Sequence, residues 1–223
     1  LRGARVIMAC RDEEKARKAI REIKARSHNM NVLHMEVDLA NMRSIREFSK
    51  TLQKEKRLDI LINNAGMPSV LDWTDDDFSM CFGVNHLELT EQSDQSHLLQ
   101  LQVPEDLNYN LFPFFTYCRS KLANIYFTQE LARTLEGKGV TAYAVHPGYV
   151  QSNWICHYSV LFRILVQVVM FMTVVYCAVS DEVLEHNGGY FTDCQPAHLR
   201  VFARDSGVAK KLWEASKRLV KLA

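Results

Sequence analysis

Short apolar runs alternate with charged, amphipathic stretches through the first sixty residues. The runs 5–10 (RVIMAC), 31–37 (NVLHMEV) and 58–62 (LDILI) have the length and composition of buried strands. Between them, 13–26 is rich in Glu, Lys, Arg and Ala, and 40–53 places four apolar side chains three to four positions apart. We therefore expect strand, helix, strand, helix, strand, an α/β order typical of a parallel sheet covered by helices on both faces.

The second half of the chain continues this alternation less regularly. Residues 74–87 and 117–135 have helical patterns, whereas 88–110 is polar and lacks an apolar helical face, apart from a strand-like alternation at 99–103. The other expected elements are two strands and a closing helix, at 140–145, 189–191 and 207–222. No internal repeat or linker interrupts the pattern, so we expect a single domain over 1–223.

The most apolar part of the chain is 154–180. Its run 160–179 is almost long enough to cross a bilayer, but it contains Arg163 and Gln167. A central arginine costs about 2.5–3.5 kcal/mol on insertion scales. Two interpretations remain open: a helical region that is buried or covers a substrate, which we favour, and a segment that inserts into or lies on a membrane.

Composition and charge exclude several classes of protein. The 223 residues include 27 basic and 26 acidic side chains, a net charge of +1, so no charge excess would attract nucleic acid. None of the six cysteines forms a CxxC pair, and Cys194 with His198 is too little for zinc, so we predict no metal site. Scattered cysteines without a signal peptide indicate a protein that is not secreted. Because the first residue is Leu1, we expect the sequence to begin inside a longer protein.

The strongest chemical signal is Tyr117 with Lys121 in the predicted helix 117–135. Residues i and i+4 project from one face of a helix, so the phenol and the ammonium group lie close together. A free tyrosine has a pKa of about 10, and a neighbouring positive charge lowers it, which lets the phenol exchange a proton with an alcohol or carbonyl oxygen. The spacing alone is weak, because it also occurs by chance on ordinary helix faces.

Further signals fall at the ends of predicted strands. Residues 63–66 (NNAG), 146–148 (HPG) and Asp38 each come directly after one, and Asn85 lies on the helix that follows the third. Open α/β sheets bind ligands beyond the carboxyl ends of their strands. In this order on one sheet, the signals are far more specific together than separately.

In this combination the sequence resembles the short-chain dehydrogenase/reductase family, and within it the retinol dehydrogenase branch. The resemblance implies a Rossmann-type, doubly wound parallel sheet and reversible hydride transfer between a nicotinamide cofactor and an alcohol or carbonyl group. It covers nearly the whole chain except 88–103 and 160–180. The segments that carry it are 2–12 (RGARVIMACRD), 37–40 (VDLA), 58–66 (LDILINNAG), 83–87 (GVNHL), 104–108 (PEDLN), 117–124 (YCRSKLAN), 127–150 (FTQELARTLEGKGVTAYAVHPGYV) and the C-terminal GGYFTDC and LWEASKRL.

The resemblance also implies roles for individual residues. Tyr117 would be the catalytic acid/base, Lys121 would bind the nicotinamide ribose and lower the pKa of that tyrosine, and Asn85 would support a water-linked proton relay to the lysine. The residues that would line the cofactor are Asp38 and Leu39 at the adenine, Asn64, Ala65 and Gly66 on the adenosine side, and Pro147, Gly148, Val150 and Ser152 at the nicotinamide end.

Arg11 bears on the choice of cofactor. It comes just after the strand 5–10, where NAD-using relatives have an acidic residue. A guanidinium group pairs with the 2′-phosphate of NADP(H), which a carboxylate would repel. The sequence therefore favours NADP(H) over NAD(H). The alternative is a solvated arginine at a helix N-terminus, which is an unfavourable place for a cation.

Two parts of the family pattern are missing from the sequence. The first strand and the TGxxxGxG turn that holds the pyrophosphate do not precede residue 5. A segment that would include the strand with the catalytic serine is absent after 83–87, where SDQS leaves Ser93 and Asp94 equally placed as remnants. In the family those strands flank 58–62, so we expect an incomplete sheet in which this run loses its partners, unless 99–103 replaces one.

Two hypotheses of function remain. The first is an NADP(H)-dependent oxidoreductase acting on retinol, retinal or another lipophilic alcohol or aldehyde, with 154–180 as its apolar cover. The second is an inactive fragment or pseudoenzyme that binds a partner or a membrane surface. A methyltransferase would leave the NNAG and YxxxK motifs unexplained. The resemblance implies association with the endoplasmic reticulum membrane, while the chain as it stands, without an anchor, is expected in the cytoplasm. Exact substrate, direction and oligomeric state stay open.

Overall fold

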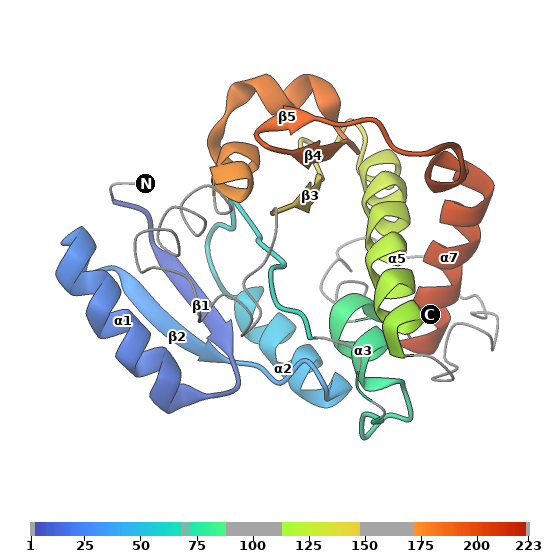
Figure 1. Ribbon diagram of the computed structural model, residues 1–223. Helices are drawn as coiled ribbons and strands as arrows, with labels where there is room; N and C mark the ends of the chain where they lie inside the picture. Colours follow the sequence, from blue (N-terminus) through green and yellow to red (C-terminus); the bar gives the residue numbers. More distant parts are fainter. Residues whose placement is uncertain (1–2, 68–69, 71, 88–112, 148–171, 222–223) are drawn as a thin grey trace, which may run out of the picture.

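The computed structural model describes residues 3–67, 70, 72–87, 113–147 and 172–221, with 113–115 described by their backbone alone. Helices α5 (Pro113–Thr134) and α7 (Ser206–Leu219) pack side by side at one end of the molecule (Figure 1). A two-stranded sheet with its helix α1 (Glu13–Ser27) forms the opposite end, and a second small sheet lies above the space between them (Figure 1).

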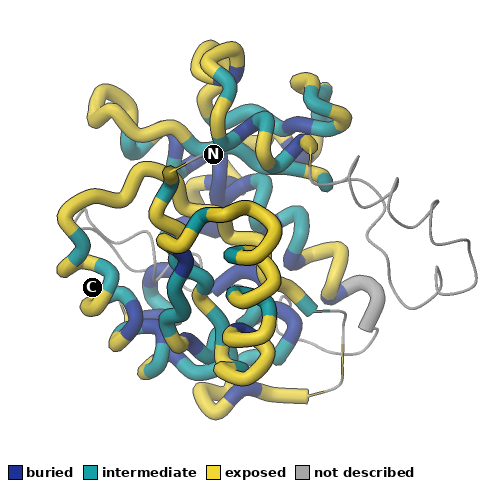
Figure 2. The backbone as a smooth tube through the Cα atoms, turned by 90° about the vertical axis from the view of Figure 1, so that its left-hand side faces the viewer, coloured by how far each residue is buried: buried dark blue, intermediate teal, exposed yellow. Residues whose placement is uncertain are grey.

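The N-terminal part is a parallel β–α–β unit. The strands β1 (Val6–Cys10) and β2 (Val32–Glu36) pair in parallel over their full length. Helix α1 connects them, and it begins where the Asp12 carboxylate accepts a hydrogen bond from the Lys15 amide at 2.9 Å. It ends at His28, which is left-handed with a φ of 55°. Most of α1 is exposed, as the helix nearest the viewer in Figure 2 shows. These three elements confirm the predicted pattern.

Helix α2 (Met42–Leu52) supplies the apolar face that the spacing predicts. It begins at Asn41, whose side-chain oxygen accepts a hydrogen bond from the Ser44 amide at 3.0 Å. Its side chains Met42, Ile45 and Phe48 are buried in the main hydrophobic core, and Ile45 is fully enclosed. The other buried side chains of this core are Val37, Phe82, Leu87, Ala123, Tyr126, Ala209, Leu212 and Val220.

A short helical segment completes the packing around α5. It consists of α3 (Met80–Phe82) and the π-helical turn η1 (Gly83–Leu87), and both pack against α5. On the other side of α5, the Tyr126 hydroxyl donates to the main-chain carbonyl of Phe202 at 2.5 Å and holds the 3-10 helix η5 (Val201–Arg204). The elements α3, η1, η5 and α7 therefore form a packed helical unit around α5.

The second sheet is small and mixed. Strand β3 (Ala144–His146) runs parallel to β4 (Tyr190–Thr192), which pairs in antiparallel fashion with β5 (Gln195–Pro196). The two residues between β4 and β5, Asp193 and Cys194, have φ values of 52° and 57°. Two consecutive positive φ angles are typical of the type I′ turn, whose twist matches that of a hairpin.

Two helical segments cover this sheet, at 172–179 and at η4 (Asp181–His186). They contribute to a smaller core of Cys177, Val183 and Phe191. In the described ranges, no helix has both the length and the apolar character needed to cross a membrane. Most of the predicted apolar segment 154–180 lies outside these ranges.

The prediction of a third strand at 58–62 is wrong. The run forms no strand, and Leu58, Ile60, Leu61 and Ile62 are 42–52% exposed. Among the described residues, β1 is bonded to β2 and β3 to β4, so two separate sheets stand where one doubly wound sheet, incomplete around 58–62, was predicted. The physical reason lies in the pairing. No strand of the described ranges lies alongside 58–62, so its main-chain groups have no ladder to join there, and its apolar side chains are open to solvent.

Two other boundaries differ from the predictions. The helix expected at 74–87 begins only at Met80, because Trp73 and Ser79 form an isolated bridge around a turn in which Asp77 has a φ of 62°. The strand expected at 140–145 begins at Ala144. The alternation at 99–103 lies outside the described residues.

The contrast between the buried α2 and the unpaired run 58–62 predicts two different effects of the same substitution. Ile45→Ala removes a fully buried side chain and should lower the free energy of unfolding by about 2–5 kcal/mol. Ile60→Ala, at a position that is 42% exposed, should change it by about 0.5 kcal/mol or less. Urea unfolding followed by circular dichroism measures both. An equal loss in the two variants would show that 58–62 is buried in solution.

Candidate active site

Tyr117 and Lys121 lie one turn apart on the same face of α5. The Lys121 ammonium nitrogen is 5.6 Å from the centre of the Tyr117 ring. Tyr117 is 38% exposed, so its side chain is open to solvent, whereas Lys121 is half-buried with its ammonium group beside Gly66. The helix predicted at 117–135 thus places the two groups as the i, i+4 spacing implies.

Asn85, in the π-helical turn η1, connects two distant parts of the chain. Its side-chain oxygen accepts a hydrogen bond from the Met67 amide at 2.8 Å, and its side-chain nitrogen donates to the Met67 carbonyl at 3.1 Å. The same nitrogen donates to the Ser120 hydroxyl at 3.1 Å, and Ser120 donates to the main-chain carbonyl of Tyr117. Asn85 is 1% exposed, so these bonds are formed away from solvent. It therefore fixes the end of the 63–67 stretch against α5.

Gly66 completes the cluster by its lack of a side chain. A Cβ atom at this position would lie 3.2 Å from the Lys121 ammonium nitrogen and 3.3 Å from the side-chain oxygen of Asn85. A side chain here would require both groups to move by a few tenths of an ångström, so the glycine favours this close approach of the main chain. The structure thus brings together three of the predicted features, the NNAG segment, Asn85 and the Tyr117–Lys121 pair.

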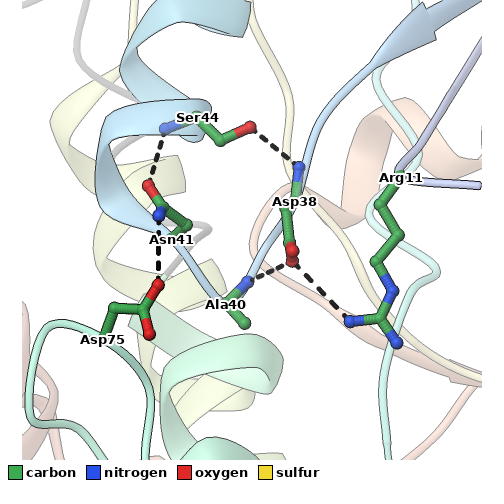
Figure 3. Close-up of polar contacts among 6 residues, drawn as sticks. All are labelled: Arg11, Asp38, Ala40, Asn41, Ser44 and Asp75. Carbon is green, nitrogen blue, oxygen red and sulfur yellow. Dashed lines mark hydrogen bonds and ion pairs between the residues drawn. The ribbon is translucent and has the colours of Figure 1, made fainter.

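Arg11 and Asp38 form a second cluster, at the carboxyl ends of β1 and β2 (Figure 3). The Arg11 guanidinium is 4.0 Å from the Asp38 carboxylate, which also accepts a hydrogen bond from the Ala40 amide at 3.0 Å. The Asp38 amide donates to the Ser44 hydroxyl at 2.9 Å. Arg11 has 74% of its side chain exposed, and an ion pair this long and exposed contributes little to stability. Its guanidinium is therefore accessible to a second anion.

Two carboxylates tie this cluster to the helical unit. Asp75 accepts a hydrogen bond from the side chain of Asn41 at 3.4 Å (Figure 3), and Asp76 accepts one from the Met42 amide at 2.8 Å. A carboxylate at the first amide of α2 also interacts favourably with the positive end of the helix dipole. The turn that precedes α3 thereby fixes the start of α2.

The remaining predicted residues are less closely placed. Asn64 and Ala65 are exposed next to Gly66, and Leu39 is half-buried against the main core. Pro147 is half-buried just after β3. The other candidates, Ser93, Gly148, Val150 and Ser152, lie outside the described residues.

Sequence patterns alone did not identify a buried network next to Asn85. The His86 ring is fully buried, with Nδ1 at 3.1 Å from the side-chain oxygen of Asn124 and Nε2 at 2.9 Å from the Ser216 hydroxyl. Asn124 in turn donates to the main-chain carbonyl of Asn85 at 2.9 Å. Two signals were present in the sequence: His86 directly follows Asn85, and Asn124 lies about one helical turn after Lys121. The contacts of His86 and Asn124 depend on tertiary packing, which these signals do not show.

Comparisons with known proteins agree with this arrangement. A model of the short chain dehydrogenase family matches residues 1–93. Human retinol dehydrogenase 11 is 38% identical over 250 residues, which cover 96% of this chain and 77% of that protein. Human retinol dehydrogenase 12 is 37% identical over 250 residues, with 98% and 79% covered. Because 250 aligned positions exceed the 223 residues of the chain, the first relative has residues inside the matched region that this chain lacks, as expected from the missing segment.

Solved structures show the same fold. An uncharacterized protein from Mycobacterium paratuberculosis superposes with a TM-score of 0.75 at 31% identity, covering 99% of this chain and 85% of that one. A short chain dehydrogenase from Escherichia coli CFT073, solved in complex with NADPH, superposes with a TM-score of 0.60 at 15% identity, covering 86% of each chain. At that identity the second likeness concerns the fold alone.

The buried ring of His86 predicts a loss of stability in mild acid. Burial lowers the pKa of His86 from 6.5 to about 4. Between these pH values the unfolded chain binds a proton that the folded chain does not, so stability is complete above pH 6.5 and falls as the pH drops toward 4, by roughly 3 kcal/mol. Urea unfolding at a series of pH values measures this slope.

Two variants separate this effect from general acid sensitivity. His86→Gln should lose the part of the slope that belongs to the buried ring, whereas the same exchange at the exposed His198 serves as the matched control. Identical slopes in the wild type and in His86→Gln would contradict the assignment.

Proposed function

The chain belongs to the short-chain dehydrogenase family, and from this premise we propose that it transfers a hydride between NADP(H) and a lipophilic alcohol or aldehyde of the retinol and retinal type. The observation that carries the proposal is the juxtaposition of Tyr117 and Lys121 on α5 with the lysine ammonium against Gly66 and Asn85. This grouping supplies a proton donor, a cation and a closely approaching main chain in one place.

The described residues fit two parts of such a dinucleotide. The Lys121 ammonium, which lies beside the main chain of Gly66, suits a sugar hydroxyl, and Asn64 and Ala65 are exposed next to this glycine. At the other end, the exposed Arg11 guanidinium suits a phosphate group. When bound, the nicotinamide ring supplies or accepts the hydride.

The chain's own part in the reaction is the movement and stabilisation of a proton. In the direction of reduction, the Tyr117 hydroxyl donates its proton to the carbonyl oxygen of the substrate, which becomes the alcohol. The Lys121 ammonium stabilises the resulting phenolate by its charge. In the direction of oxidation the phenolate takes the proton back. Asn85 contributes by holding Met67 in a fixed position relative to α5.

Arg11 supports NADP(H) rather than NAD(H) as the cofactor. Its guanidinium lies at the end of β1 on a side chain that is 74% exposed, so a 2′-phosphate placed there would gain a charge-assisted contact. Solved structures of the same fold contain NADPH, among them the Escherichia coli dehydrogenase. The preference for NADP(H) therefore rests on Arg11, while the shared fold is one that accommodates NADPH in that relative.

The lipophilic class of substrate rests on the relatives and on the apolar character of the chain. Retinol dehydrogenases 11 and 12 match nearly its full length. The helix at 172–179 exposes Met172, Val175 and Val179, each about half accessible, next to the second sheet. An exposed apolar face of this kind suits a hydrophobic ligand or a membrane surface. Association with the endoplasmic reticulum membrane is part of the same proposal.

A second candidate is a member of the family that binds without catalysing. It is favoured by one observation, the unpaired and exposed run 58–62 between the two sheets. An interrupted sheet holds the two ends of a dinucleotide site less firmly than a continuous one. The catalytic residues would then be present while the cofactor binds too weakly for turnover.

The proton transfer predicts a clear effect of Tyr117→Phe. The variant should bind NADPH as the wild type does, because the hydroxyl contributes little to affinity, while the rate of retinal reduction falls about 10²–10⁴-fold. Binding is measured by NADPH fluorescence and turnover by loss of absorbance of NADPH. Cys118→Ser, at an exposed position on the same turn, is the matched control. Wild-type protein that binds NADPH without any turnover would favour the second candidate, and retained turnover in Tyr117→Phe would contradict the mechanism.

The phosphate contact predicts a cofactor-selective effect of Arg11→Ala. Loss of one charge-assisted contact should weaken NADPH binding by roughly tenfold and leave NADH binding nearly unchanged. Arg17→Ala removes an exposed arginine of α1 that pairs with Glu13 instead, and it should change neither affinity. Fluorescence titration with both cofactors measures the ratio. An equal loss for NADPH and NADH would place the 2′-phosphate elsewhere.

A further inference from the structure

The buried network behind Asn85 has a defined direction. A main-chain carbonyl only accepts hydrogen bonds, so the Asn124 nitrogen must face the carbonyl of Asn85, at 2.9 Å. The Asn124 oxygen then faces His86 Nδ1 at 3.1 Å, and Nδ1 must carry the hydrogen. In the neutral ring Nε2 is left as an acceptor, and the Ser216 hydroxyl, 2.9 Å away, donates to it. Every polar atom of the imidazole and carboxamide groups is satisfied in this arrangement.

The network is also held rigidly. His86 is 0% exposed, and its ring lies 5.0 Å from the Phe82 ring and 5.9 Å, edge to face, from the Phe127 ring. Ser216 is equally buried on α7. A ring enclosed by aromatic neighbours has no room to turn over, so its hydrogen-bonding direction stays fixed.

We propose that His86 and Asn124 are positioning residues that hold the main chain of Asn85, so that its carboxamide stays directed at Met67 and Ser120. This inference rests on the proposed function, because it explains how the Tyr117–Lys121 pair and the Gly66 segment keep their relative position. The hydrogen bonds run from Ser216 through His86 and Asn124 to the Asn85 carbonyl. Helix α7, which contributes no residue to the proposed chemistry, is thereby coupled to the site.

Asn124→Asp gives the sharpest test in the full chain. The two side chains have nearly the same shape, but a carboxylate places an acceptor against the acceptor carbonyl of Asn85 and should push it away. The Met67 amide, which donates to Asn85 Oδ1, should then lose about tenfold or more of its protection from hydrogen exchange relative to the Ile45 amide in α2. If Asn124→Asp does not fold, Asn124→Ala is measured in the same way.

Thr128→Val is the matched control. Thr128 lies one turn further along α5, is buried where Asn124 is half-buried, and donates from its hydroxyl to the main-chain carbonyl of Asn124 rather than to a side chain of the network. In Thr128→Val, the protection of the Met67 amide from hydrogen exchange, divided by that of the Ile45 amide, should stay within about twofold of the wild-type ratio. A purely structural contribution of Asn124 would lower the protection of the Met67 and Ile45 amides together and leave their ratio unchanged. An unchanged ratio in both Asn124→Asp and Asn124→Ala would therefore overturn the positioning role.

Two further measurements keep the outcomes distinct. The ¹⁵N spectrum of wild-type His86 should show a protonated Nδ1 and an unprotonated Nε2, and the opposite tautomer would overturn the proposal without any variant. With retinal and NADPH, kcat of Asn124→Asp should fall at least about tenfold more than that of Thr128→Val. Wild-type protein that fails to bind NADPH would overturn the proposed function, while hydrogen exchange at Met67 would still decide the role of His86 and Asn124.

Discussion

The double hydrogen bond between the Asn85 carboxamide and Met67 is the contact on which the candidate site depends. The carboxamide offers one acceptor and one donor group, and it satisfies both the N–H and the C=O of a single residue, at 2.8 and 3.1 Å. A neighbouring strand would satisfy main-chain groups in the same way. Asn85 thus substitutes for a sheet partner at the end of a stretch that has none among the described strands, and it does so next to the point where Gly66 lies against Lys121.

It follows that the residues of the candidate site are held by helices more than by a sheet. The contacts that place Asn85 come from α5 and, through Asn124 and His86, from α7. The run 58–62 that leads into this segment is exposed and unpaired, and it contributes little to the position of Gly66. In an ordinary doubly wound sheet the strand ends themselves would define the site. Here buried side-chain hydrogen bonds define the position of the site instead.

The sequence predicted those parts of the fold whose information is local. Periodicity placed α2 and α5, since an apolar face at helical spacing is visible within one segment, and the charged, alanine-rich composition of 13–26 placed α1. The run 58–62 has the composition of a strand as clearly as β1 does, yet it is not one, because a strand needs a neighbour as well as a sequence. The i, i+4 spacing brought Tyr117 and Lys121 together correctly. The link from His86 to Ser216 joins residues 130 positions apart, and no local pattern encodes it.

The two ends of the proposed cofactor site are held in different ways, and this bears on the choice between an enzyme and a binding protein. Arg11 and Asp38 belong to the β1–β2 unit, which reaches the helical unit through α2 and the carboxylates of Asp75 and Asp76. Tyr117 and Lys121 belong to α5 itself, and Gly66 lies directly against Lys121. Between these ends runs 58–62, without a ladder on either side within the described residues. Proton transfer needs only the second, well-held group, whereas dinucleotide affinity needs both groups at a constant separation. Affinity for the cofactor is therefore the property that the interrupted sheet affects most, and it decides whether the assembled tyrosine and lysine come to act on a substrate.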